Sequence, residues 1–101
     1  APVRSKSPGT EIMPTREVTI SNKLGLHARA AAKLVNIANG YNAEVILEKQ
    51  GQKINGKSIM GVMMLAASQG TPIRITVSGE EEDEALRSLV DLIDDKFGEP
   101  E

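Results

Sequence analysis

Two periodicities in the order of apolar and polar residues predict the secondary structure of this chain. Alternation with a period of two, or a run of β-branched residues, is typical of strands and predicts them at residues 16–21, 43–48, 53–55 and 73–78. Apolar residues three and four apart form one stripe along a helix. This spacing, together with one short segment that is apolar nearly all round, predicts helices at residues 28–39, 58–67 and about 80–97.

Glycine and proline mark the ends of several elements. Gly40 directly follows the first helix, and Gly70 and Pro72 are expected to end the second. Residues 50–52 contain a glycine between two predicted strands and are expected to form the turn of a hairpin.

The last helix has an apolar stripe made of Ala85, Leu86, Leu89, Val90, Ile93 and Phe97. Acidic residues crowd positions 80–84, Lys96 lies in the expected last turn, and both match the helix dipole. Gly98 is expected to end this helix. The order of elements, with its hairpin, predicts an α+β open-faced β-sandwich, in which three helices pack on one face of a four-stranded antiparallel sheet.

The composition is that of one small domain. The chain has 101 residues and 40% of them are hydrophobic, which suits a single globular unit. It lacks cysteine, so disulfides and thiolate metal sites are excluded and a cytoplasmic location is expected. The net charge is −2 and only one Tyr and one Phe are present, which gives little support to nucleic-acid binding. No apolar run is long enough to insert into a membrane.

The domain is expected to span residues 15–98. Residues 1–10 contain three turn-forming residues, Pro2, Pro8 and Gly9, and show no periodicity, so residues 1–14 are expected to be a disordered N-terminal extension. Met13 directly precedes the patterned region and is interpreted as the natural start. Residues 99–101 are assigned to a short C-terminal tail.

His27 is the only histidine and lies directly before the predicted helix 28–39. The first N–H groups of a helix lack intrahelical partners, and with the positive end of the dipole they form an anion site. A phosphoryl group on His27 would lie over these donors, with Arg29 close enough to add charge-assisted hydrogen bonds. A lone histidine at a helix start is more often an ordinary surface or capping residue than a reactive one, so the spacing alone favours that interpretation. The spacing does not support a metal site, a catalytic triad or a P-loop.

The predicted helix 58–67 contains three of the four methionines. Flexible thioethers suit a surface that docks several partners, and they also serve as gap fillers in a buried core, so both interpretations stay open. Ser58 is a plausible N-cap. A phosphate on it would be compatible with the helix and would place negative charge beside the apolar residues.

Two segments carry a resemblance to a known family. Residues 22–33 read NKLGLHARAAAK, and residues 55–65 read NGKSIMGVMML. In this order, within this succession of elements, they resemble the histidine-containing phosphocarrier proteins (HPr) of the bacterial phosphoenolpyruvate-dependent phosphotransferase system. The likeness covers roughly residues 16–98.

The resemblance implies a role for each matching residue. His27 is expected to accept a phosphoryl group on Nδ1 from Enzyme I and to pass it to an EIIA-type domain, and Arg29 is expected to steady that phosphate. Ser58 is expected to be phosphorylated by an ATP-dependent HPr kinase/phosphorylase. The apolar residues expected to contact partners are Ile59, Met60 and Met63. The protein would then be a monomeric phosphoryl carrier without cofactor or metal, not an enzyme.

Two positions depart from the usual family pattern. Ala30 stands where the family usually has proline, and Leu24 stands where some members have Asn or Ser. A leucine at position 24 resembles the nitrogen-regulatory branch of the family. Residues 57–63 instead resemble a kinase-regulated HPr, so the sequence leaves open whether the chain belongs to the sugar or the nitrogen branch.

Two other functions compete with the carrier. A regulatory binding module would act through Ser58, Met60 and Met63 without any phosphoryl relay. A small hydrolase would need a second catalytic group near His27, and the sequence offers no convincing one.

Overall fold

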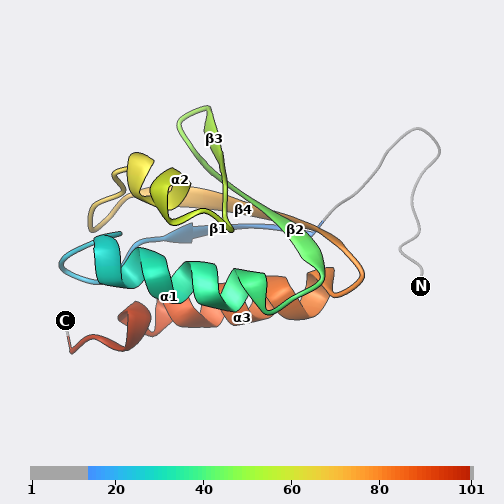
Figure 1. Ribbon diagram of the computed structural model, residues 1–101. Coiled ribbons are helices and arrows are strands. Elements are labelled where there is room, and N and C mark those ends of the chain that lie inside the picture. The colour runs from blue at the N-terminus through green and yellow to red at the C-terminus, as the bar shows by residue number, and fades with distance from the viewer. Residues whose placement is uncertain (1–13, 101) are drawn as a thin grey trace.

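Four antiparallel strands form one sheet in the order β1–β4–β2–β3 in the computed structural model, which describes residues 14–100 (Figure 1). The strands are β1 (Thr15–Thr19), β2 (Ala43–Lys49), β3 (Gln52–Asn55) and β4 (Pro72–Gly79). The helices are α1 (Ala28–Asn39), α2 (Ile59–Met64) and α3 (Glu82–Asp94), and a 3₁₀ turn, η1 (Lys96–Gly98), follows α3. The α+β open-faced sandwich with three helices is confirmed. The expectation for residues 1–14 falls, apart from Pro14, outside the described residues.

The alternation of the strands places one apolar face against the helices. β4 is central and buries Ile73, Ile75 and Val77, while the side chains between them are less buried. Val18 of β1 is paired with Ile73, and Val45 of β2 with Val77. Buried side chains of neighbouring strands therefore meet on the same face and form the floor of the core.

α1 and α3 lie side by side across this face (Figure 1). The stripe predicted for α1 is buried at Ala31, Leu34, Val35 and Ala38, together with Ala30. α2 packs near α1 and adds the fully buried Val62 to the same cluster. The three helices and the sheet thus share one core, and α1 begins and ends where the sequence predicted.

The second helix is shorter than predicted. It ends at Met64, whereas the expected end was near Ala67. The chain turns because Ala66 has a φ of 51°, in the left-handed region that a helix cannot continue through. Leu65 and Ala67 are both buried beyond the helix, and Lys49 Nζ donates to Leu65 O at 2.7 Å. Burial of these two side chains, rather than Gly70 or Pro72, ends α2; Pro72 instead opens β4.

The last helix also ends early. α3 stops at Asp94, and Lys96 and Phe97 adopt φ of 56° and 57° in η1. Phe97 is nevertheless fully buried, because the turn rather than a further helical turn brings its ring into the core. The predictions that Lys96 lies in the last helical turn and that Gly98 ends this helix were therefore wrong.

Candidate functional site

The loop before α1 is held against the turn that follows α2. Gly25 has a φ of +70°, and a Cβ there would lie 2.6 Å from Ala67 O, so both the conformation and the space require glycine. The next residue, Leu26, donates its N–H to Ala67 O at 2.9 Å. This close approach places His27 at the start of α1, next to the loop residues that contact the turn after α2.

His27 is the N-cap of α1. Its backbone is extended, with φ −80° and ψ 178°, and its Nδ1 accepts a hydrogen bond from the Arg29 backbone N–H at 3.2 Å. The ring therefore meets the unpaired N–H groups at the positive end of the helix dipole. Its side chain is 27% exposed, so the imidazole is held in place and still reachable from solvent.

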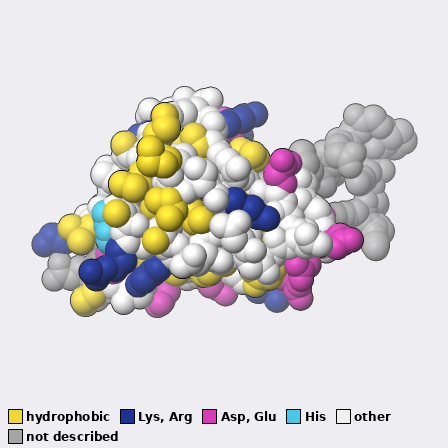
Figure 2. Space-filling model, in the orientation of Figure 1, with side chains coloured by type: hydrophobic (Ala, Val, Ile, Leu, Met, Phe, Trp, Pro, Cys, Tyr) yellow, Lys and Arg dark blue, Asp and Glu magenta, His cyan; other side chains and the backbone are white. Residues whose placement is uncertain are grey.

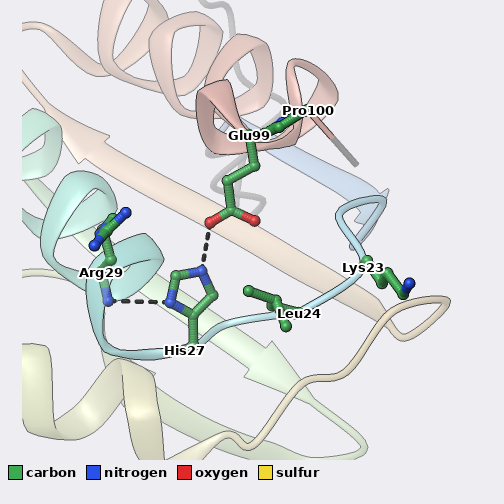
Figure 3. A pocket seen from close by; sticks show the side chains of 6 residues that line it. All are labelled: Lys23, Leu24, His27, Arg29, Glu99 and Pro100. Atoms are coloured by element: carbon green, nitrogen blue, oxygen red, sulfur yellow. Dashed lines mark hydrogen bonds and ion pairs between the residues drawn. The ribbon is translucent and has the colours of Figure 1, made fainter.

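The other ring nitrogen, Nε2, contacts the Glu99 carboxylate (Figure 3). A hydrogen bond from the Asn22 amide, together with the contact to His27, lowers the pKa of Glu99 from its ordinary value, so this carboxylate is ionised at neutral pH. An ionised carboxylate only accepts hydrogen bonds. The two contacts therefore assign the ring proton to Nε2 and leave the lone pair of Nδ1 facing the start of α1.

An open pocket of about 610 Å³ surrounds the ring and is lined by Lys23, Leu24, His27, Arg29, Glu99 and Pro100 (Figure 3). Arg29 contributes its backbone N–H to Nδ1, while its exposed guanidinium forms no ion pair with any of the described residues. The pocket thus combines a histidine with two basic side chains and one carboxylate, and it has room for a phosphoryl group.

Ser58 is the N-cap of α2, as predicted. Its Oγ accepts a hydrogen bond from the Gly61 N–H at 3.1 Å. The side chain is half-buried, and the exposed apolar residues of α2 directly follow it in the chain.

The α2 patch, which we define as Ile59, Met60, Met63 and Met64, faces solvent. Met60 is 74% exposed and Met64 is 65% exposed. The sequence left open whether these methionines fill the core or lie on the surface, and the structure places them on the surface. Met64 is exposed in the same way, in addition to the three residues named from the sequence. Figure 2 shows hydrophobic side chains gathered on this face, with the single histidine and basic side chains at its edge.

Three comparisons with known proteins agree on one family. The family model "PTS HPr component phosphorylation site" matches residues 14–95. The chain belongs to the HPr family. The phosphocarrier protein HPr of Pseudomonas aeruginosa is 53% identical over 90 residues, covering 88% of this chain and all of that protein.

Solved HPr structures share the same fold. A crystal structure of HPr from Thermoanaerobacter tengcongensis matches with a TM-score of 0.85 and 45% identity, covering 88% of this chain and all of that one. A second structure from the same organism, an HPr dimer, matches with a TM-score of 0.70 and 44% identity, covering 89% of this chain and 99% of that one. No helix within residues 14–100 has the length and apolarity needed to cross a bilayer.

Glu99 is the site residue that sequence reasoning missed. It was assigned to a tail, yet it contacts a histidine 72 positions earlier in the chain. The one signal in the sequence is Phe97, a large apolar residue two positions before Glu99. Its burial in the core brings the following residues against the domain.

Proposed function

We propose that His27 is the residue on which this phosphocarrier protein carries its phosphoryl group. Membership of the HPr family gives the general function, a phosphocarrier of the phosphotransferase system rather than an enzyme. The single observation that carries the residue assignment is the hydrogen bond from the Arg29 N–H to Nδ1. It directs a nucleophilic lone pair toward the anion-binding end of α1.

The transfer is a displacement at phosphorus. The Nδ1 lone pair attacks, the N–P bond forms, and the bond between phosphorus and the donor protein breaks. The phosphoryl oxygens then become acceptors for the N–H groups at the start of α1, and the Arg29 guanidinium supplies charge-assisted hydrogen bonds. Because the site is open rather than enclosed, it holds the group loosely enough to pass it on.

The partners belong to the phosphotransferase system. In this proposal Enzyme I is the donor, an EIIA-type domain is the acceptor, and both dock on the α2 patch beside His27. The support is the exposure of Ile59, Met60 and Met63, since an apolar surface of this kind allows weak docking with fast release.

Regulation would act through Ser58. A phosphate added by an HPr kinase/phosphorylase suits the start of α2 and places negative charge beside the α2 patch. We further propose a cytoplasmic monomer as the working form, whereas one Thermoanaerobacter relative was crystallised as a dimer. A purely regulatory module without phosphoryl relay is not favoured, because the family match is to phosphocarriers.

The decisive experiment is labelling with phosphoenolpyruvate and Enzyme I, followed by mass spectrometry at neutral to alkaline pH. His27→Asn is the informative variant, because asparagine is a good N-cap and keeps α1 intact while removing the nucleophile. Wild-type protein should carry one acid-labile phosphate at His27, and His27→Asn should carry none. Acid-labile phosphate retained in a folded His27→Asn protein would refute the assignment.

A further inference from the structure

We propose that Glu99 is a positioning residue for phosphoryl transfer: its carboxylate holds the His27 ring with Nδ1 unprotonated and balances the positive charge that the ring gains. This role rests on the proposed function of His27. It lies outside the family match, which ends at residue 95. The geometry behind it is the contact between Nε2 and the Glu99 carboxylate on the side of the ring away from α1 (Figure 3).

Glu99 is itself held in place by the fold. The Asn22 side chain is fully buried, and its Nδ2 donates to Glu99 Oε1 and to Gly25 O, each at 2.9 Å. The Glu99 side chain is only 14% exposed. A residue of a loose tail would not be fastened through a buried amide that also braces the loop carrying His27.

The turn before Glu99 is anchored at two points. Phe97 is fully buried in the core, and its carbonyl oxygen accepts a hydrogen bond from Lys33 Nζ at 2.6 Å. Because Lys33 is on α1, the same helix that presents its N-terminus to His27 also fixes the segment that carries Glu99. The carboxylate therefore has little freedom to leave the ring.

The chemistry of the transfer explains what such a carboxylate contributes. Attack by the Nδ1 lone pair on phosphorus needs no proton loss, since the ring proton is on Nε2. As the N–P bond forms and the donor's bond to phosphorus breaks, the ring becomes a phosphoimidazolium with a formal positive charge. Glu99 keeps its hydrogen bond to Nε2 and offsets this charge. In the onward transfer a nucleophile of the EIIA-type acceptor forms a bond to phosphorus while the N–P bond breaks, the electron pair of that bond returns to Nδ1, and the ring becomes neutral again.

Glu99 could also serve only to hold the last residues against the domain, without affecting the His27 ring. Experiments can separate this structural role from the positioning role. The imidazole ¹⁵N chemical shifts of the full chain report which ring nitrogen carries the proton. Glu99→Ala removes the acceptor, Glu99→Gln keeps an acceptor oxygen without charge, and Glu99→Asp keeps the charge on a shorter side chain. Glu44→Gln, an exposed carboxylate at the far end of the sheet from His27, is the matched control.

We expect the neutral wild-type ring to be protonated at Nε2, and Glu99→Ala to show a mixture of both tautomers. Glu99→Gln should keep the wild-type tautomer yet accept the phosphoryl group from phospho-Enzyme I about twofold to fivefold more slowly, as for loss of one weak charge pair that solvent still screens. Glu99→Asp should recover part of the rate, and Glu44→Gln should match wild type.

Wild-type ¹⁵N shifts and transfer rates in both Glu99→Ala and Glu99→Gln would overturn the role of Glu99 and leave that of His27 intact. Phosphate found on wild-type protein at a residue other than His27 would instead overturn the proposed function. The two failures are thus distinguishable in the same set of samples.

Discussion

The starts of α1 and α3 are built in opposite ways. α3 has Glu82, Asp83 and Glu84 in its first turn, whereas α1 has no acidic residue there and is capped by His27. The residue before α3, Glu81, makes no side-chain capping hydrogen bond to it. α3 thus balances the positive end of its dipole with its own carboxylates.

The start of α1 is left without such a balance, which suits a negative group that arrives and departs. A carboxylate fixed in that turn would compete with the phosphoryl group for the same N–H donors. The charge of the first turn thus distinguishes a helix end that only stabilises the fold from one that is available to a ligand. Changes at the starts of α1 and α3 test this contrast directly, and changes at Ser58 and Glu99 test the charges around the site.

The largest effect is expected from making α1 resemble α3. Ala28→Glu places a carboxylate at the first position of α1, where the side chain is exposed and the fold can accept it. Repulsion of the incoming phosphoryl group should slow phosphorylation by phospho-Enzyme I about tenfold, while thermal stability stays unchanged or rises slightly. Rapid-quench labelling measures the rate, and Ala28→Gln controls for side-chain size. Equal rates in the two variants would contradict the electrostatic account of this helix end.

A smaller effect is expected at the start of α2. Ser58→Asp keeps a good N-cap but adds one negative charge beside the α2 patch. The affinity for Enzyme I, measured by titration calorimetry, should fall about threefold to tenfold, because docking must desolvate that charge. Ser58→Asn, which caps without charge, should bind as wild type does. Unchanged affinity in the aspartate variant would separate the α2 patch from Enzyme I docking.

The converse change at α3 should affect stability and not function. Asp83→Asn and Glu84→Gln remove exposed charges from its first turn. Each should lower the free energy of unfolding by about 0.3–1 kcal/mol at low salt, and less at high salt. Urea denaturation measures this, and labelling at His27 should proceed at the wild-type rate. A slowed transfer would mean that the two helix ends are not independent.

The smallest effect concerns acid pH. The Asn22 hydrogen bond and the His27 contact lower the pKa of Glu99. The contribution of Glu99 to the stability of the folded state is therefore fully present above the ordinary glutamate pKa, and it is lost as the pH falls through the lowered pKa. Below about pH 4.3 the Glu99 carboxylate, which faces Asn22, His27 and Lys33, should begin to release the chain end before the domain unfolds. Side-chain amide signals of Asn22, followed by NMR from pH 6 to pH 3, report this step. Signals that move only with global unfolding would show that Glu99 does not contribute separately.

Much of the fold could be predicted because its signals are local. The stripe and the flanking residues of α1 give its two ends, and the alternation of β4 gives its buried face. The errors lie at the ends of α2 and α3, where the helical pattern continues in the sequence. There, burial of Leu65 and Phe97 outweighs local helix propensity and turns the chain through left-handed backbone conformations.

The candidate site also has a part that local sequence predicts and a part that depends on tertiary packing. His27, Arg29 and Ser58 could be named from the sequence, because a helix start and its cap are properties of a few consecutive residues. The pairing of His27 with Glu99 and the exposure of the methionines of α2 depend on which surfaces the packed sheet and helices leave uncovered. Contacts between residues 72 positions apart have no local signature, so they emerge only when the core brings the chain end back to the start of α1.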